Sequence, residues 1–572
     1  MNDFKSYLEK PRTAACLLLL LCAIVFFTGL GSYPFTDRDE GLYATVALNM
    51  ERSGDYFIPE INGKKFLDKP ILAFWLSGFF QKILGSNEFS LRAGSAFSAV
   101  LLLCFMFMFI YKISGNVLTS SLIIISTAFS PIFAVVAKTF LVDMPLVLFT
   151  TVSLLGFFIA TEKDSKTWPW YLIFWTGLSL GFLTKGPVAP AVIIPSALIY
   201  AFSQRKTLSV LKKSLIPAGI VIFLILNFWY FVVYLKMGDA FINDFFMKQI
   251  LKRGTKSLVG HAGIPFYYFL IIMLFTYPFF PSSLAGFIDA AERWMKGKLS
   301  TPLERLIFFS AIIVAAVVAV FTVAATKLPH YILPAVPFLG ILSGYYLSLL
   351  FNRTKTSNIS THAFMGLHIV LSLAFIIAAV ILYFMLPSSW EYMVKNLVPD
   401  KNEYALPAAP PSALLSSLAI ILTGLAAFAA VTVFRRKMPE RMVMLVCFSG
   451  LFICTAGFFS AAYTIRHIQQ PAKDMALDLK RRISGGEFIA AYGLWKPCLF
   501  YYVGKEMKRY RFDSADDNDE FIELLKTDKK IFILTRTRFK DKLATIPGFV
   551  ELSQHGPYML GGNSKAVTPA GK

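Results

Sequence analysis

Thr13–Gly31, TAACLLLLLCAIVFFTGLG, is a long apolar run, and the polar Thr36–Tyr43, TDRDEGLY, follows it closely. The first part is apolar over about the length that crosses the roughly 30 Å hydrocarbon core of a bilayer. The second part places acids and a tyrosine beside it, and Phe66–Pro70, FLDKP, adds an aspartate and a lysine. A channel or a simple membrane anchor has little use for such a loop, whereas an enzyme that acts at the membrane surface on a charged lipid does.

The composition of the whole chain is that of a polytopic membrane protein. Of its 572 residues, 56% are hydrophobic and 16% are charged, whereas soluble domains carry roughly 25% charged residues. The shorter apolar segment 71–84 fits a helix in the membrane interface. Longer apolar runs predict about thirteen transmembrane helices, at residues 13–31, 91–110, 118–137, 143–160, 170–183, 187–203, 214–235, 265–285, 305–325, 331–350, 363–386, 412–434 and 441–463.

The distribution of basic residues predicts which side each loop occupies. In a soluble protein a net charge of +21 suggests nucleic acid, but here we expect membrane lipids and no nucleic acid as partners, because basic loops set membrane topology. With the N-terminus inside, the inner loops carry most of the short basic clusters, at 204–213, 286–304, 351–362 and 435–440. Five of the six cysteines lie in apolar runs, which argues against a disulfide framework.

The tail, residues 464–572, differs from the rest of the chain because it lacks a long apolar run. Short β-type runs at 487–492 and 530–535 flank a helical stretch near 519–526, which predicts a small α/β domain. We therefore expect two domains. A membrane domain covers 1–463 with its outer loop 32–90, and a soluble outer domain covers 464–572.

Ionisable residues gather at the predicted outer ends of the spans, where they are costly unless they face water, a partner or a substrate. Carboxylates there can act as a general base or orient an acceptor. Lysines can hold a phosphate and stabilise leaving-group charge, and a carboxylate with a histidine can share a divalent cation. The residues are Asp39, Glu40, Lys69, Asp143, Lys185, His261, Lys327 and His330.

Each of these residues also has a structural interpretation. Asp39 and Glu40 fit a solvated loop or the N-terminus of a helix, and Asp143 fits a helix cap. The three lysines fit interfacial residues whose charged ends reach for water. The two histidines fit hydrogen-bonded loop positions. Their collection on one side of the membrane favours the functional interpretation.

Five ordered blocks give the chain a family likeness. It resembles the GT-C membrane glycosyltransferases of the dolichyl/polyprenyl-phosphate-mannose protein mannosyltransferase-like group, and within them the transferases that add 4-amino-4-deoxy-L-arabinose to lipid A. The likeness covers roughly residues 10–350 and is more specific for the fold and a lipid-phosphate-sugar donor than for the sugar. The blocks are Asp39–Ala44, Ser53–Tyr56, Phe66–Pro70, Leu183–Gly186 and Lys327–Pro334.

The resemblance implies roles for single residues. Asp39 matches the catalytic acid of the first outer loop, with Glu40 beside it, and Asp143 matches a second functional aspartate. Lys69 matches the lysine that contacts the lipid phosphate. Asp68 and His261 match a carboxylate and a histidine that can hold zinc, magnesium or manganese. The implied substrate-binding residues are Tyr43, Lys69, Lys185, Lys327 and His330.

The resemblance also implies the reaction and its location. We expect an inverting transfer of a sugar from undecaprenyl phosphate to lipid A or a related envelope acceptor, on the periplasmic face of a bacterial inner membrane and without a nucleotide. The aminoarabinose enzymes usually have Arg-Tyr and Glu-Lys-Pro where this chain has Leu42-Tyr43 and Asp68-Lys69-Pro70, so the sugar and the metal stay open. The alternatives are a protein O-mannosyltransferase-like enzyme, a lipid or solute transporter, and a structural membrane protein.

Overall fold

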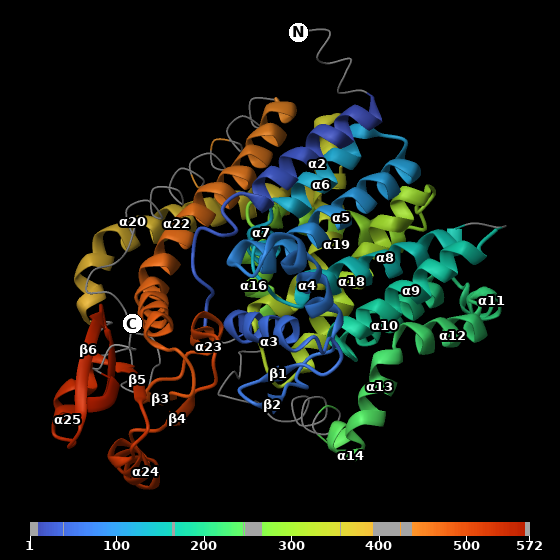
Figure 1. The fold of residues 1–572 in the computed structure, drawn as a ribbon. Coiled ribbons are helices and arrows are strands. Elements are labelled where there is room, and N and C mark those ends of the chain that lie inside the picture. The colour runs from blue at the N-terminus through green and yellow to red at the C-terminus, as the bar shows by residue number, and fades with distance from the viewer. Residues whose placement is uncertain are drawn as a thin grey trace.

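The computed structural model describes residues 10–566 except 38, 163–165, 244, 246–265, 355 and 393–437, the last range apart from 424 and 429. Most of this chain is a helical bundle (Figure 1). Within these residues, six helices are long and apolar enough to cross a membrane, or up to nine if each bent pair is one span. The six are α5 (Glu88–Ser114), α8 (Asp143–Glu162), α18 (Pro302–Val323), η2 with α19 (Pro329–Ala335 and Val336–Phe351), α20 (Asn358–Tyr392) and α22 (Pro439–Arg482).

Three further apolar segments are bent helix pairs. In the first, Pro131 begins the second helix; proline has no N–H to continue the preceding helix. The pairs are α6 with α7 (Val117–Ala128 and Pro131–Ala137, 69°), α12 with α13 (Ile216–Leu226 and Phe228–Met237, 49°) and α16 with α17 (Tyr267–Phe275 and Phe280–Met295, 119°). The remaining helices of the bundle are α2 (Pro11–Phe27), α9 (Trp168–Lys185), α10 (Val188–Ser203), α11 (Thr207–Lys213) and α14 (Asp239–Phe241).

The predicted helical membrane fold is confirmed by this bundle. Each predicted span other than 412–434 coincides with a helix or a bent pair. The segment 412–434 falls almost entirely outside the described residues, so the total of about thirteen spans stays a prediction. Segment 71–84 is indeed a helix, α4 (Leu72–Leu84), and its interfacial position also stays a prediction.

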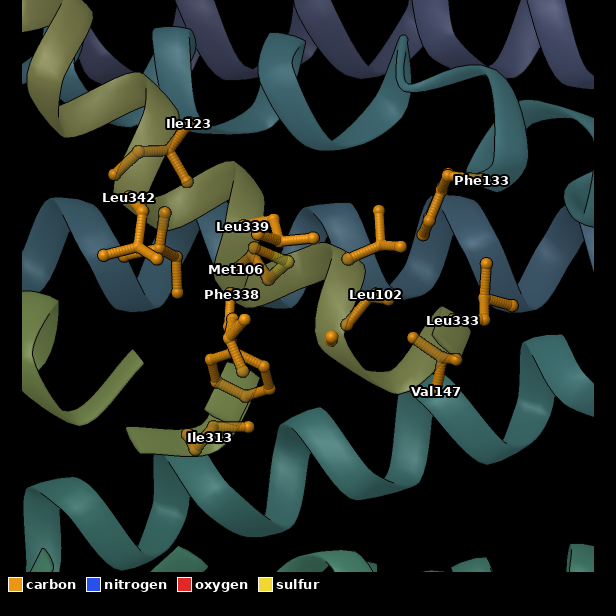
Figure 2. Packing of buried hydrophobic residues seen from close by; sticks show 14 of the residues in the cluster. Leu102, Met106, Ile123, Phe133, Val147, Ile313, Leu333, Phe338, Leu339 and Leu342 are labelled. Atoms are coloured by element: carbon orange, nitrogen blue, oxygen red, sulfur yellow. The ribbon is translucent and has the colours of Figure 1, made fainter. Parts of the chain in front are cut away.

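The centre of the bundle is a continuous apolar core. Figure 2 shows side chains from α5, α6, α7, α8, α18, η2 and α19 packed against one another. Close packing of this kind fixes the relative positions of the helix ends. The labelled residues are Leu102, Met106, Ile123, Phe133, Val147, Ile313, Leu333, Phe338, Leu339 and Leu342.

The polar loop that follows α2 is largely structured. It contains helix α3 (Asp39–Ser53) and a two-residue hairpin turn at Asn62-Gly63, both with positive φ, a geometry that favours these residue types. The turn joins β1 (Glu60–Ile61) to β2 (Lys64–Lys65), and α4 follows. In Figure 1, α3, the hairpin and α23 (Pro497–Val503) of the C-terminal domain lie at the same end of the molecule.

The C-terminal domain is the predicted α/β unit. Its sheet has the order β4-β3-β5-β7-β6, with parallel pairing from β4 to β5 and antiparallel pairing from β5 to β6. Helix α22 continues without a break across the predicted boundary at 463/464 and joins the bundle to the sheet (Figure 1). The elements are β3 (Phe488–Tyr492), α23 (Pro497–Val503), β4 (Lys508–Tyr510), α24 (Ala515–Lys526), β5 (Ile531–Arg536), η4 (Thr537–Phe539), α25 (Lys540–Ala544), β6 (Phe549–His555), β7 (Tyr558–Asn563) and η5 (Ser564–Ala566).

Candidate functional site

A cavity of about 400 Å³ lies where the start of α3, the start of α8, the end of α9 and the 3-10 helix η2 meet. It brings together most of the ionisable residues that the sequence singled out. Its lining residues are Thr36, Asp37, Asp39, Glu40, Leu42, Tyr43, Asp68, Lys69, Thr139, Leu141, Asp143, Lys185, Thr326, Leu328, His330 and Tyr331.

Helix ends supply several charged groups of this cavity. Asp39 and Asp143 are the first residues of α3 and α8, and Lys185 is the last residue of α9. Acids at a helix N-terminus and a base at a C-terminus both complement the helix dipole. The positions of the helix ends therefore place these three charges at the cavity. Asp68 and Lys69 come from the loop between β2 and α4.

Asp39 and Glu40 are neighbours with opposite environments. Asp39 is exposed at the border of the cavity, whereas the Glu40 side chain is 1% exposed and pairs with Arg92 of α5, which is fully buried. Glu40 accepts hydrogen bonds from Arg92 Nε and Nη2 at 2.7 and 3.0 Å, from the Thr36 N–H and hydroxyl at 2.8 and 2.9 Å, and from the Phe140 N–H at 3.1 Å. This arrangement suits a positioning role for Glu40 better than the catalytic role predicted for it.

The electrostatics of Glu40 follow from these partners. Burial alone would raise the pKa of Glu40, but the charge of Arg92 and the hydrogen bonds from Arg92, Thr36 and Phe140 together hold that pKa below its ordinary value of 4.5. The carboxylate therefore stays ionised at neutral pH. Arg92 also donates to the carbonyls of Leu30, Tyr33 and Pro34, so one buried pair ties the loop before α3 to the bundle.

A second group of charges centres on Asp143. Lys185 donates to its carboxylate at 2.7 Å, and His330 Nε2 lies 3.9 Å from it. The side chains of Lys185 and Asp143 are 10% and 4% exposed, and the Lys185 ammonium lies 4.5 Å from the centre of the Tyr331 ring. Three separate elements, α8, α9 and η2, thus converge on one corner of the cavity.

Lys69 and Asp68 border the same cavity. The Lys69 ammonium is 3.3 Å from the backbone carbonyl of Asp68. Asp68 was also predicted as a metal ligand with His261, which lies outside the described residues. Within the part of the chain that the structure describes, no group of three or more His, Cys, Asp or Glu residues could hold a metal ion. The pairing of Asp68 with His261 at a metal ion therefore stays a prediction.

Lys327 and Tyr43, both predicted to bind substrate, are less accessible from the cavity than Lys69 and Lys185. Lys327 does not line the cavity; its ammonium donates to the carbonyls of Thr322 and Ala324 at 2.7 and 3.1 Å, at the end of α18. Tyr43 borders the cavity but is 3% exposed. Its ring packs edge-on against Phe74, with 5.6 Å between centroids, so most of the ring belongs to the core.

Sequence reasoning missed several residues of the site. Arg92 interrupts an apolar helix, which is itself a sign of an intramembrane partner. Tyr331 belongs to the block that carried the resemblance. Asp37 lies two residues before Asp39, and its partner Lys496 comes from the C-terminal domain. No sequence spacing indicates that last contact, because more than 450 residues separate its members.

Comparisons with known proteins agree with this fold. The family model described as dolichyl-phosphate-mannose-protein mannosyltransferase matches residues 68–231. An uncharacterized protein of Aquifex aeolicus is 28% identical over 339 residues, which are 58% of this chain and 63% of that protein. The undecaprenyl phosphate-alpha-4-amino-4-deoxy-L-arabinose arabinosyl transferase of Yersinia enterocolitica is 28% identical over 339 residues, 58% of this chain and 59% of the relative. The match thus spans less than two thirds of either relative.

Solved structures extend the likeness to nearly the whole chain. The crystal structure of ArnT from Cupriavidus metallidurans bound to undecaprenyl phosphate has a TM-score of 0.78 at 18% identity, covering 97% of this chain and 99% of that one. Its apo structure has a TM-score of 0.76. The predicted GT-C fold with a small C-terminal sheet domain is confirmed. This chain is a multi-pass membrane protein with a GT-C fold, and its sequence resembles the mannosyltransferase-like glycosyltransferases.

Proposed function

We propose that this protein transfers a sugar from undecaprenyl phosphate to lipid A, or to a related envelope acceptor, on the periplasmic side of the bacterial inner membrane. The observation that carries the proposal is the cavity that gathers Asp39, Lys69, Asp143, Lys185 and His330 from separate elements. A relative named for transfer from undecaprenyl phosphate and a similar fold solved with undecaprenyl phosphate support a lipid-linked donor. The sugar to test first is 4-amino-4-deoxy-L-arabinose.

The lysines of the cavity suit the leaving group of this reaction. When the bond between the anomeric carbon and the phosphate oxygen breaks, its electron pair stays on the oxygen, and charge grows on undecaprenyl phosphate. An ammonium held at that point stabilises the charge, and Lys69 lines the cavity. Lys185 has three donor hydrogens and directs one to Asp143, so Asp143 orients it for the same phosphate.

The exposed Asp39 suits the acceptor. A hydroxyl acceptor would form the new bond from its oxygen to the anomeric carbon, while its proton passes to the Asp39 carboxylate. Attack from the side opposite the departing phosphate inverts the anomeric centre. A phosphate acceptor is already an anion and depends less on this base. Glu40 takes no proton in this scheme; its ion pair with Arg92 holds the first turn of α3 in place.

A matrix of substrates tests the proposal. Purified protein in liposomes receives undecaprenyl phosphate carrying aminoarabinose or mannose, together with lipid A, dephosphorylated lipid A or a serine/threonine-rich peptide, and products are identified by mass spectrometry. We expect a sugar adduct on lipid A that is lost in Lys69→Ala and kept in Lys64→Ala, which removes an exposed lysine of β2. If only the peptide is modified, the acceptor is a protein hydroxyl and not lipid A. If labelled lipid crosses the bilayer and no sugar adduct forms, the proposed transfer activity is wrong and the protein is a transporter.

A further inference from the structure

Asp37 and Glu40, two residues before and one residue after Asp39, are held by different parts of the molecule. Glu40 is tied to the helical bundle through Arg92. Asp37 is tied to the C-terminal domain, where Lys496 forms an ion pair with one carboxylate oxygen and the Cys498 thiol donates to the other at 2.9 Å. Asp39 therefore lies close in sequence to two anchored residues, Asp37 and Glu40.

The contact between Lys496 and Asp37 is shielded from solvent. The two side chains are 0% and 2% exposed. Gln469 of α22 connects them, because its amide N–H donates to Asp37 at 3.0 Å and its amide oxygen accepts from Lys496 at 2.9 Å. We refer to Lys496, Gln469 and Cys498 as the Asp37 clamp. A buried charge pair whose remaining donors and acceptors are also satisfied fixes one geometry.

The Lys496 side chain keeps its charge although it is buried. Burial alone would lower the pKa of Lys496, but the negative charge of Asp37 outweighs it and raises that pKa above the ordinary value. The Lys496 ammonium therefore does not escape burial by losing its proton. Removal of either partner would leave the other charge buried without compensation, which is the costly way to break such a pair.

Helix α3 and helix α23 also pack closely against each other beside the Asp37 clamp. Gly41 of α3 packs so closely against the start of α23 that an added Cβ would lie 2.8 Å from the Cys498 nitrogen. The Thr45 hydroxyl is 3.2 Å from the Pro497 carbonyl, and the Phe35 N–H donates to the Tyr502 hydroxyl at 2.8 Å. Contacts on both sides of Asp39 thus dock the first turns of α3 and α23 against each other.

We propose that Lys496 and Gln469 are positioning residues for Asp39, so that the C-terminal domain forms part of the catalytic machinery through the Asp37 clamp. This inference rests on the proposed function, since it assumes that Asp39 acts in transfer. Asp37 lines the cavity, whereas Lys496 is not among its lining residues and contacts Asp37 instead. The loss of Lys496 should consequently slow the chemical step and leave donor binding at Lys69 in place.

The test compares full-length variants in lipid nanodiscs. Lys496→Met removes the charge at similar length, Lys496→Arg keeps it, and Lys540→Met is the matched control because it breaks an exposed ion pair with Glu551 in the same domain. We expect kcat to fall about tenfold to a hundredfold in Lys496→Met, as for a small misplacement of a catalytic group, with the Kd for undecaprenyl phosphate unchanged. Lys496→Arg should recover much of the loss, and Lys540→Met should match the wild type.

A second measurement is independent of activity. Hydrogen–deuterium exchange of the amides in 36–45 should rise in Lys496→Met, while exchange in α24 stays constant. If Lys496→Met does not fold, Gln469→Met carries the same expectations with the ion pair retained. The inference is wrong if a folded variant keeps its kcat. It is also wrong if kcat and donor binding fall equally and hydrogen–deuterium exchange rises throughout the protein. A wild type that transfers no sugar, with exchange still raised only in 36–45, would instead refute the proposed function.

Discussion

Lys185 and Asp143 meet across 2.7 Å at one wall of the cavity. One is the last residue of α9 and the other the first residue of α8. Each charge complements the dipole of its own helix, and together they neutralise each other at 10% and 4% side-chain exposure. The pair therefore places a lysine beside the proposed phosphate position without leaving an uncompensated buried charge.

Breaking this pair should affect turnover and stability together. Lys185→Met leaves Asp143 without its main partner, which for a buried pair costs about 3–5 kcal/mol, while Lys185→Arg keeps the charge. We expect a lower thermal midpoint and a strongly reduced transfer rate in Lys185→Met, and partial activity in Lys185→Arg. The double variant Lys185→Met/Asp143→Asn should lose less stability than the two single changes predict together. Additive losses would show that the pair is not energetically coupled.

Lys69 should matter for the donor rather than for folding. A hydrogen bond from a charged group contributes about 1.5–3 kcal/mol, so Lys69→Ala should weaken undecaprenyl phosphate binding by about 10–150-fold. Titration of the purified protein in detergent measures the Kd. Lys64→Ala serves as the control, since Lys64 is exposed in the hairpin next to the same loop. An unchanged Kd in Lys69→Ala would remove this residue from the donor site.

Glu40 should be needed for stability at neutral pH. Glu40→Gln leaves the buried Arg92 guanidinium uncompensated and should cost about 3–5 kcal/mol. The folded pKa lies below the ordinary 4.5, so the stabilisation is fully present above pH 4.5 and is lost as pH falls through the folded pKa. The gap in thermal midpoint between wild type and Glu40→Gln should thus narrow below pH 4.5. A gap that is constant from pH 7 to the acid range would contradict this role.

Much of the fold follows from the sequence for physical reasons. Each span is a local apolar run whose length matches a bilayer. The β-type runs of the tail can likewise be recognised from a few neighbouring residues. The predicted boundary at 463/464 has no such local signal, because α22 is one continuous helix of 44 residues that runs from the bundle to the C-terminal sheet. Helix propensity carries no information on where a bilayer ends.

The site was predictable only where charge interrupts apolar sequence. Asp143 and Lys185 stand out because intramembrane charges are costly without a partner. Glu40 could not be separated from Asp39, since the difference between them depends on Arg92, 52 positions away. Lys496 gave no signal, because a lysine in a polar tail is ordinary until packing buries it against Asp37.

The proposed orientation predicts the accessibility of two engineered cysteines. Ala544→Cys lies on the exposed face of α25 in the C-terminal domain, and Ser209→Cys is exposed in the basic helix α11. In cells with a permeabilised outer membrane, a membrane-impermeant maleimide should label Ala544→Cys at once and Ser209→Cys only after lysis. The unmodified protein corrects for its native cysteines. Reversed labelling would place the cavity and the C-terminal domain in the cytoplasm.

The single-turnover rate of sugar transfer from undecaprenyl phosphate in Asp39→Asn tests whether this cavity is the site of transfer. The substitution keeps the shape of the side chain and removes its basicity, so a hydroxyl acceptor should react at least about a hundredfold more slowly. Donor affinity should stay at the wild-type value, and Asp519→Asn, in the exposed face of α24, should transfer normally. Wild-type rates in Asp39→Asn would contradict the account of this cavity as the site of transfer.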